Sequence, residues 1–419
     1  MPLKLAFRLD ANSEIGTGHL MRCLALAERL SAVGVDCYFF CHDLPSALLP
    51  LLAPYPDQPL ATHDDIAPIA ALRPDWLIID HYQIGRDLEA RLAPHCRQLL
   101  VIDDLADRVH HCHYLLDQGP RRQAADYHDL VPADCRLLLG ADFALLRPAY
   151  RQLARHQAGA WRKGLICFGG ADPAGASLIT LDSLARIASA QDIAWTVVAG
   201  PASATREALE TRLADTPQHH ITLLQHSAEM PQLMAEHDFT IGAAGGMTWE
   251  RACIGLPTLA VPIVDNQAFN DAAIAHYRIA VRLSLRELAD PACLEAGLRH
   301  LHDEADAYRQ RGQDLVDGLG LDRLASLILP AADWYLVANG PEWQLWQAWH
   351  LKMRLRLSGP ILSWQAETAA DPLLWQKLAD CLANSLSLSS YCLANPPAIV
   401  PPAPWVADQD RWSLRIGAS

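Results

Sequence analysis

The stretch FRLDANSEIGTGHLMRCLALAERL, residues 7–30, decides the fold of the first half of the chain. It opens on the end of an apolar run, passes through a glycine-containing turn and closes with apolar residues at helical spacing. A strand, a glycine turn and an amphipathic helix in this order form the opening unit of a Rossmann-like domain. We therefore predict that Arg8 and Asp10 mark the end of a parallel strand, and that His19 opens the helix.

The same alternation of apolar runs and helical patterns continues on both sides of a polar stretch at residues 147–164. Continuous apolar runs are typical of parallel strands that are covered on both faces. We expect strands at residues 3–9, 36–40, 75–80, 98–103 and 114–118, and again at 165–170, 195–200, 220–225, 239–246 and 257–264. Helices are expected at residues 19–34, 84–95, 174–189 and 205–215.

This pattern predicts an α/β protein with two Rossmann-like domains in tandem. The first domain is expected at residues 1–148 and the second at 164–330, joined by a linker at 149–163. Ligands of such sheets bind at the carboxyl ends of the strands. We therefore expect the two domains to face each other across a cleft that holds the ligand.

The residues after about 330 have a different character. Eight of the twelve tryptophans lie between Trp334 and Trp412, and PPAIVPPAPW at 396–405 is rich in proline. In EWQLWQAWHLKMRLRL, residues 342–357, three tryptophans recur at helical spacing, which predicts a helix with one face packed on something. We expect the extension at 331–419 to dock against the body of the protein or against a partner.

The overall composition excludes several classes of function. Of the 419 residues 51% are hydrophobic and 20% charged, which is typical of a well-packed globular protein. The formal charge of −14 argues against a nucleic-acid or anionic-membrane surface, although it leaves room for a small anionic ligand held by local dipoles. No apolar run approaches the length of about 18 residues that a membrane span needs.

The eleven cysteines and the N-terminus bear on the cellular compartment. The cysteines form no CxxC pair and several lie inside apolar runs, which indicates reduced, buried thiols. The N-terminus enters a strand almost at once, without a basic leader and an apolar segment after it. We expect a cytoplasmic protein.

The first candidate site is IGTGH, residues 15–19. Gly16 and Gly18 allow the backbone to approach a ligand closely, and the helix start near His19 attracts negative charge. An imidazole there titrates near neutral pH and can accept a proton from water. A plain glycine turn with a capping or packing histidine is the alternative interpretation.

The second candidate is FGGADPAGA, residues 168–176, in which a strand ends in Gly169 and Gly170. Asp172 and Pro173 then open a helix, with the residue types that favour a helix start. The turn could receive an anion at the carboxyl edge of a sheet. A simple strand-to-helix connection fits the same residues.

The third candidate is IGAAGGMTWERACIGLPTLAVPIVDNQAFN, residues 241–270. Gly242, Gly245 and Gly246 precede a helix whose first amides could receive phosphate. Glu250 lies one turn into this helix and could accept hydrogen bonds from ribose hydroxyls, or it could only complement the helix dipole. Asn266 and Gln267 follow the next strand and are expected to face the cleft.

Two further polar groups follow strands of the first domain, Asp80-His81-Tyr82 and Asp103-Asp104. The nearby run from His110 to His113 contains three histidines and a cysteine. Adjacent residues rarely converge on one ion, and no partner motif occurs elsewhere. We therefore expect no metal site in this run.

Together these motifs resemble a known family. RLDANSEIGTGHLMRCLALA, IIDHY, VIDDLADR, LLDQG, LLGADFALLRPAY, FGGADP and GAAGGMTWERACIGLP with DNQ occur in the order found in the UDP-2,4-diacetamido-2,4,6-trideoxy-β-L-altropyranose hydrolases of pseudaminic acid biosynthesis. That family has the GT-B fold and is related to the MurG glycosyltransferase. The resemblance covers residues from about 3 to about 330 and leaves the extension unexplained.

The resemblance implies a GT-B-like fold and a metal-independent hydrolysis at the anomeric carbon, with C–O cleavage and inversion, that releases UDP and the free sugar. It implies that His19 is catalytic and that the second domain binds UDP, with no cofactor. The residues expected to bind the substrate are Arg8, Asp10, Gly16, Gly18, Asp80, Tyr82, Arg147, Gly169, Gly170, Gly245, Gly246, Met247, Thr248, Glu250, Asn266 and Gln267.

The chain departs from the family pattern at two places. Gly246-Met247 stands where relatives often have Ser-Thr, which removes a possible phosphate-binding hydroxyl, although Thr248 remains. Ala252-Cys253 stands where they often have a cysteine pair. Two other functions fit the same residues: a GT-B glycosyltransferase, in which His19 deprotonates an acceptor hydroxyl, and a nucleotide-sugar binder without catalysis.

Overall fold

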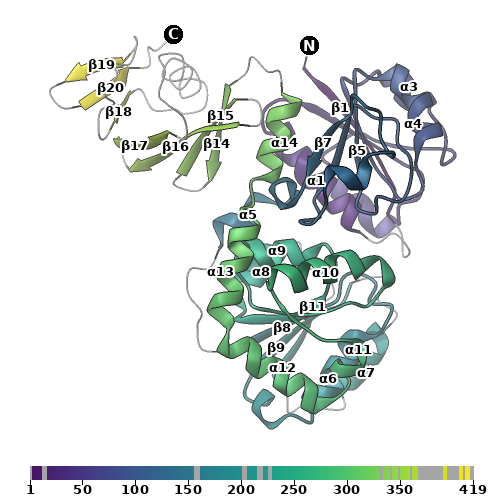
Figure 1. The fold of residues 1–419 in the computed structure, drawn as a ribbon, viewed down its shortest axis with the longest axis vertical. Helices are drawn as coiled ribbons and strands as arrows, with labels where there is room; N and C mark the ends of the chain where they lie inside the picture. Colours follow the sequence, from purple (N-terminus) through teal and green to yellow (C-terminus); the bar gives the residue numbers. More distant parts are fainter. Residues whose placement is uncertain are drawn as a thin grey trace. The chain divides into compact units, whose positions relative to one another are not determined.

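The structure is a computed structural model of the chain. It describes residues 2–11, 17–154, 161–200, 205–214, 220–224 and 229–329, and the backbone of seven strands between 334 and 415. The chain divides into two compact units, Met1–Leu321 and Asp322–Ser419, and Figure 1 shows their helices and strands. Among the described residues, no helix combines the length and the apolarity that a membrane crossing requires.

The first sheet has seven strands in the order β3-β2-β1-β4-β5-β6-β7, and all its neighbours are parallel. Its strands are β1 (Lys4–Leu9), β2 (Asp36–Cys41), β3 (Asp57–Pro59), β4 (Trp76–Asp80), β5 (Gln98–Ile102), β6 (Tyr114–Asp117) and β7 (Arg136–Leu139). Its α-helices are α1 (Gly18–Ser31), α2 (Leu49–Leu52), α3 (Ala67–Leu72) and α4 (Arg86–Leu92), and α5 (Pro148–Gln152) follows the last strand.

The second sheet has six parallel strands in the order β10-β9-β8-β11-β12-β13. These are β8 (Lys163–Cys167), β9 (Ala194–Val198), β10 (Ile221–Leu224), β11 (Phe239–Ala243), β12 (Thr258–Val261) and β13 (Val281–Arg282). The helices are α6 (Ala176–Leu184), α7 (Arg206–Ala214), α8 (Met230–Glu236), α9 (Met247–Ile254), α10 (Ala268–Tyr277), α11 (Leu285–Leu288), α12 (Pro291–Asp303) and α13 (Ala305–Leu315), and α14 (Gly320–Ile328) contains the boundary between the two compact units.

Both sheets are wound in the same way. In each, the chain builds outward from the first strand, then returns to its other side, so the direction reverses between β1 and β4 and again between β8 and β11. The central strands β4 and β11 are buried at every residue, as expected for parallel strands covered on both faces. The predicted α/β fold with two Rossmann-like halves is therefore confirmed.

Within the two parallel sheets, three strands were not predicted from the sequence. β3 contains a proline and β13 has only two residues, so neither shows an apolar run. The leucine run of β7 is only four residues long and did not by itself indicate a strand. All three lie toward the outside of their sheets, where a short strand suffices because it pairs on one side or covers little of the core.

The segment before the second sheet packs into that sheet's core. Tyr150 on α5 belongs to the same buried cluster as Trp249 on α9 and Leu165 on β8, and α5 contacts both α8 and α9. The predicted linker at 149–163 thus begins with a helix that is anchored by its tyrosine. This places α5 beside the helix that carries Glu250.

The second unit contains a seven-stranded sheet in the order β14-β15-β16-β17-β18-β20-β19. Its strands are β14 (Trp334–Asn339), β15 (Glu342–Gln347), β16 (His350–Ser358), β17 (Ile361–Ala366), β18 (Ser390–Leu393), β19 (Trp405–Asp408) and β20 (Arg411–Arg415). All neighbours are antiparallel except β17 and β18.

The helix predicted at 342–357 is wrong, because β15 and β16 form an antiparallel pair there. In HLKMRLRL the apolar residues alternate strictly with basic ones, which is the period of a strand. The tryptophan spacing suggested a helix only because it was considered without this alternation. The side chains on which the predicted docking depends, Trp343, Trp346 and Trp349, lie outside the described ones.

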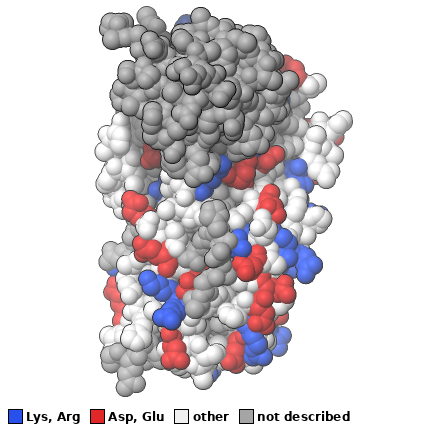
Figure 2. All heavy atoms as spheres, turned by 90° about the vertical axis from the view of Figure 1, so that its left-hand side faces the viewer, with Lys and Arg blue, Asp and Glu red and all other residues white. Residues whose placement is uncertain are grey.

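On the face drawn in Figure 2, acidic and basic side chains lie interspersed over the described residues. The net charge of −14 is therefore not gathered there into one large acidic area. Attraction of an anionic ligand then depends on local groups, such as helix starts and buried cations.

Candidate functional site

The first half of the candidate site lies where the winding of the first sheet reverses. α1 follows β1 and begins at Gly18, while Asp80 is the last residue of β4 and pairs with Leu9 of β1. The crevice at such a reversal is the usual ligand site of an open α/β sheet. The topology thus brings His19 and Asp80, which are 61 positions apart, next to each other.

His19 is fixed by a buried carboxylate. Its Nδ1 forms a short hydrogen bond with Oδ1 of Asp80, and the His19 side chain is 5% exposed. The charged Asp80 carboxylate can only accept, so Nδ1 carries a proton, and in the neutral ring the lone pair is then on Nε2. Within the described part of the chain, no residue forms a hydrogen bond with Nε2. The ring is therefore set up to accept a proton at Nε2.

Arg22 keeps this carboxylate charged. Its Nε donates to Oδ2 of Asp80 and its Nη2 to Oδ1, both at 2.6 Å, and Asp80 is completely buried. Burial alone raises the pKa of Asp80, but the charge and hydrogen bonds of Arg22, together with His19, lower it well below its usual range. His19 and Arg22 lie three residues apart, on the same inward face of α1.

Tyr82 packs against the ring of His19. Its ring meets the His19 ring edge-on, with centroids 4.5 Å apart and an angle of 88°. Burial raises the pKa of the Tyr82 hydroxyl, and the nearby charge of Asp104 raises it further, so the hydroxyl stays neutral. Asp104 also contacts Arg22, at 3.5 Å.

Gly18 is exposed and a side chain there would meet open space, so close packing does not require this glycine. Gly16 lies outside the described residues.

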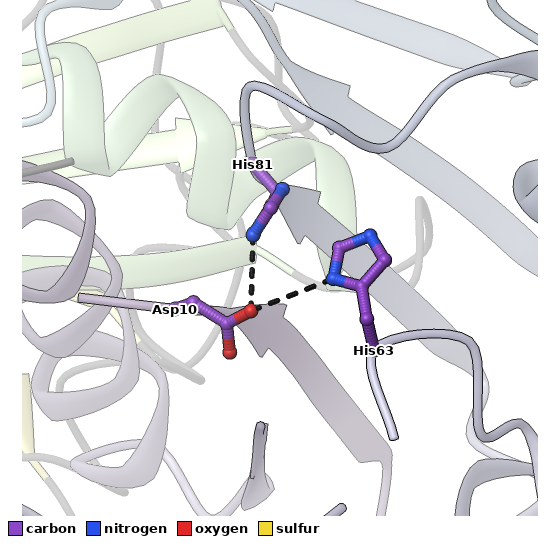
Figure 3. Close-up of side chains that lie close together, drawn as sticks. All are labelled: Asp10, His63 and His81. Carbon is purple, nitrogen blue, oxygen red and sulfur yellow. Dashed lines mark hydrogen bonds and ion pairs between the residues drawn. The ribbon is translucent and has the colours of Figure 1, made fainter. Parts of the chain in front are cut away.

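Contact of Arg8 and Asp10 with the substrate stays a prediction, and the structure shows the partners that both residues have within the protein. Both are almost fully buried and pair with each other through two hydrogen bonds of 2.9 and 3.2 Å. Figure 3 shows His81 and His63 directed at the same carboxylate oxygen of Asp10. Both oxygens of Asp80 likewise have partners within the protein, His19 and Arg22.

The ligand atoms of Asp10, His63 and His81 lie within 4.8 Å of one another, a spacing that suits a metal ion. The hydrogen bonds of these residues, however, do not suit a metal ion. The backbone N–H of Gln83 donates to Nδ1 of His81 at 3.0 Å, so the ring proton is on Nε2, which donates to Asp10 and is not available as a ligand. Arg8 Nη2 also lies 3.1 Å from Nδ1 of His63 and already supplies a cation.

The residues of the histidine run at 110–113 form hydrogen bonds with different partners. His110 Nδ1 bonds with Oε1 of Glu89 at 2.8 Å, and the backbone N–H of His111 donates to the other oxygen of Glu89. His113 Nδ1 accepts the N–H of Leu99 at 2.9 Å. These contacts tie the segment to α4 and β5.

The second half of the site lies at the reversal of the second sheet, and its first turn follows β8. Gly169 has a φ of +91°, in the left-handed region that favours glycine. Asp172 accepts the backbone N–H groups of Ala176 and Ser177 at 2.8 and 2.9 Å. Its own carboxylate thus occupies the first backbone amides of α6, and anion binding at this turn stays a prediction.

The turn before α9 is different, because no side chain caps this helix. Gly246 is its N-cap residue and Met247 its first helical residue. A side chain built on Gly246 would meet nothing within 4 Å. An uncapped helix start with open space before it suits an anion.

A buried cation lies beneath this turn. Arg251 is 2% exposed, and its Nη2 donates to the carbonyl of Ala243 and, at 3.1 Å, to Oγ1 of Thr248. Its Nε and Nη1 have no hydrogen-bond partner among the described residues. Burial lowers the pKa of Arg251 to about 10, which still leaves it charged at neutral pH. The Thr248 hydroxyl accepts the hydrogen bond from Arg251 and can still donate its own proton, so its predicted contact with phosphate stays a prediction.

Gln267 lies against the same turn. Its Oε1 accepts the backbone N–H of Ile263 at 3.0 Å, which leaves the amide nitrogen on the other side. A side chain built on Gly245 would lie 3.4 Å from that nitrogen. The predicted residues Gly245 and Gln267 are thus brought together, while Asn266 beside them is exposed.

Glu250 lies on α9, one turn below these amides, and is half-buried. Burial raises the pKa of Glu250 above its ordinary value, and a hydrogen bond from Tyr150 and the charge of Arg147 offset only part of this rise. Tyr150 and Arg147 both come from the segment at α5. The structure therefore places the predicted Arg147 next to the predicted Glu250, with Tyr150 between them.

The two halves of the site meet at their turns. A side chain built on Gly170, after β8, would lie 3.7 Å from Oγ1 of Thr17, just before α1. The Tyr277 hydroxyl at the end of α10 donates to the carbonyl of Pro120 at 3.0 Å. The first approach joins the carboxyl edges of the two sheets, as the sequence predicted, and the second joins the loop after β6 to the end of α10.

Comparisons with known proteins identify relatives for part of the chain. No protein-family model matches the chain. The chain is 33% identical over 173 residues to the UDP-2,4-diacetamido-2,4,6-trideoxy-β-L-altropyranose hydrolase of Campylobacter jejuni, which is 41% of this chain and 61% of that protein. It is 28% identical over 204 residues to the spore coat polysaccharide biosynthesis protein SpsG of Bacillus subtilis, covering 47% and 59%.

The chain thus spans only about three fifths of the length of these relatives, 61% and 59%. Among solved structures, it is similar to MurG of Acinetobacter baumannii, with a TM-score of 0.52 and 16% identity over 78% of this chain and 99% of that one. At this identity the likeness concerns the fold alone, which is of the GT-B type.

Proposed function

We propose that this protein hydrolyses a UDP-linked 2,4-diacetamido-2,4,6-trideoxy hexose at the anomeric carbon, with His19 as the general base. The observation that carries the proposal is the His19–Asp80–Arg22 arrangement, in which a buried ion pair holds Nδ1 of the imidazole and leaves Nε2 without a hydrogen-bond partner among the described residues. This chain of contacts serves to orient a base, and its position at a sheet reversal is where a ligand binds.

In the proposed step a water oxygen attacks C1 of the hexose while Nε2 of His19 takes one of its protons. The bond between C1 and the diphosphate oxygen breaks, and its electron pair leaves with UDP. Because the water enters opposite the leaving group, the configuration at C1 inverts. Asp80 stabilises the imidazolium that forms, in the way that a buried carboxylate does in hydrolytic triads.

The diphosphate is proposed to bind at the start of α9. The uncapped amides around Gly246, the side-chain amide of Gln267 and the buried charge of Arg251 all lie there. Fixed dipoles and a fixed cation stabilise the charge that develops on the leaving oxygen without having to reorganise. UDP is a stable anion, so with this support neither a metal ion nor a proton donor is needed.

Glu250 is proposed to accept hydrogen bonds from the ribose. Its place one turn below the phosphate-binding amides suits this role, and the contacts from Tyr150 and Arg147 favour its charged form. The identity of the sugar rests on the Campylobacter jejuni relative, whose name states its substrate. The chain residues in contact with the sugar are expected near Tyr82 and Asn266.

The proposal is tested with the full chain, a UDP-2,4-diacetamido sugar of altro type, its gluco counterpart, and no acceptor. Proton NMR follows the anomeric signals. We expect UDP and free sugar from the altro compound, with the inverted anomer formed first. Release of UDP only after an acceptor sugar is added would instead identify a glycosyltransferase, and tight binding without release would identify a nucleotide-sugar binder.

A further inference from the structure

A second histidine–carboxylate pair lies directly behind the first. His81 follows Asp80 in the chain, is 2% exposed, and its Nε2 lies 3.0 Å from Oδ2 of Asp10. Its Nδ1 accepts the N–H of Gln83 at 3.0 Å. Both ring nitrogens of His81 therefore have partners, and the ring is fixed in one orientation and one tautomer.

Asp10, the anchor of this pair, is itself held from several sides. Its Oδ1 accepts the backbone N–H groups of His42 and Asp43 at 2.7 and 3.1 Å. Arg8 donates to both of its oxygens. A buried carboxylate with this many donors stays charged and has little freedom to move.

The position of His81 in the chain connects this histidine–carboxylate pair to His19. Residue 81 lies between Asp80, which holds Nδ1 of His19, and Tyr82, whose ring packs against the same imidazole. Fixing the side chain of His81 on Asp10 therefore fixes the turn that holds His19 from two sides. A displacement of this turn by a fraction of an ångström would move both contacts together.

We propose that His81, anchored on Asp10 and Arg8, is a positioning residue that sets the orientation and tautomer of His19 through the turn 80–82. The proposal rests on the proposed function of His19 as a base. It assigns to the cluster in Figure 3 no contact with substrate and no metal.

The kinetic test compares His81→Leu with His81→Gln. The glutamine keeps an N–H near the position of Nε2 and can still donate to Asp10, whereas leucine cannot. We expect His81→Leu to lower kcat by about 10- to 100-fold, because the base is misplaced, while the Kd for UDP is unchanged. His81→Gln should recover most of the loss, and His128→Leu, at a histidine whose side chain is 83% exposed, is the matched control.

A purely structural role would lower stability and UDP binding together, so unchanged UDP affinity with a reduced kcat supports positioning. Equal losses in kcat and UDP affinity, or equal activities of the leucine and glutamine variants, would overturn the proposal. The UDP measurement also shows whether His81→Leu folds.

The spectroscopic test reads the tautomer of His19 itself and needs no turnover. In ¹⁵N-histidine-labelled protein, with His19 assigned from the spectrum of His19→Gln, we expect the Nδ1–H tautomer in the wild type and in His81→Gln. His81→Leu should show a mixture of tautomers, and an unchanged tautomer there contradicts the proposal. A wild type that hydrolyses nothing would refute the proposed function while this result still decides the positioning.

A titration with Zn²⁺ alone decides the remaining interpretation of the cluster. We expect no stoichiometric binding that depends on His81, because its Nε2 carries a proton and Arg8 lies beside His63. Stoichiometric Zn²⁺ binding that is lost in His81→Leu would make the cluster a metal site and overturn the proposal.

Discussion

At the scale of single residues, the account depends on which nitrogen of His19 is free. Asp80 accepts from Nδ1, so the lone pair is on Nε2, and Arg22 keeps Asp80 charged. The sequence motif could identify His19, because a histidine after a glycine turn at a strand end is a local signal. It could not identify the role of Asp80, since their contact joins residues 61 positions apart and depends on the strand order.

The first prediction concerns His19→Gln. Loss of the base should lower kcat by about 10²- to 10⁴-fold, because general-base catalysis contributes on that order. UDP affinity should not change, since the groups proposed to hold UDP belong to the second sheet. The measurements are initial rates of UDP release and UDP titration calorimetry, with His128→Gln as the exposed control. Full activity in His19→Gln would contradict the assignment of the base.

The second prediction concerns the pH dependence of stability. The folded-state pKa of Asp80 is lowered below its ordinary value of 3.8, so its ion pair stabilises the fold above that pH and the contribution is lost as the pH falls below it. Asp80→Asn leaves the Arg22 charge buried without its partner and should cost about 3–5 kcal/mol at neutral pH. The difference in Tm between wild type and variant should shrink on acidification; a constant difference would argue against a charged Asp80.

At the scale of elements, the two glycine turns of the second sheet differ in whether a side chain occupies the start of the helix that follows. From the sequence, the turns before α6 and α9 are both candidates, because each combines glycines with a strand end, and the segment that contains the second is the more specific. The structure separates them through the side chain of Asp172, which caps α6 and leaves only the start of α9 uncapped. Such capping depends on the backbone conformation of one residue, Asp172 at φ +41°, which a sequence pattern does not give.

The third prediction follows from this difference. Asp172→Ala should destabilise the fold by about 1 kcal/mol through loss of the cap, with an added cost for alanine at positive φ. Asp172→Asn should cost less, because asparagine can cap and tolerates this conformation. Neither variant should change UDP affinity. Urea unfolding measures the change in stability, and UDP titration measures the affinity. Weaker UDP binding in Asp172→Ala would contradict this prediction and indicate that the start of α6 takes part in phosphate binding.

A matched pair of glycines gives the fourth prediction. A methyl group on Gly242 would lie 2.3 Å from Nη1 of Arg251 and 2.4 Å from the carbonyl oxygen of Cys167, so Gly242→Ala should cost about 1–3 kcal/mol of stability. A methyl group on Gly246 would meet nothing, and this residue has an ordinary helical conformation. Gly246→Ala should therefore keep the wild-type Tm but weaken UDP binding, because the methyl group enters the proposed phosphate space. Unchanged UDP affinity in Gly246→Ala would contradict the phosphate site.

At the scale of the whole molecule, the sequence predicted the doubly wound architecture because ten of its strands are continuous apolar runs of ordinary length. The prediction failed in the extension, where the tryptophan spacing indicated a helix although the residues of β16 alternate with the period of a strand. All residues in the proposed chemistry lie within the unit Met1–Leu321.

The fifth prediction is that a chain lacking residues 331–419 keeps UDP release but changes in solubility or oligomeric state, because the extension is expected to dock on the body or on a partner. Size-exclusion chromatography with light scattering, together with the UDP-release assay, tests this. Identical solubility, oligomeric state and activity in the two chains would contradict the docking prediction.

The most direct test of the central claim is hydrolysis of the UDP-sugar in H₂¹⁸O, followed by mass spectrometry of both products at short times. If water activated at Nε2 of His19 attacks the anomeric carbon, the label enters the free sugar and UDP contains none, and His19→Gln forms neither product at a comparable rate. Label in the β-phosphate of UDP would show attack at phosphorus and contradict the account.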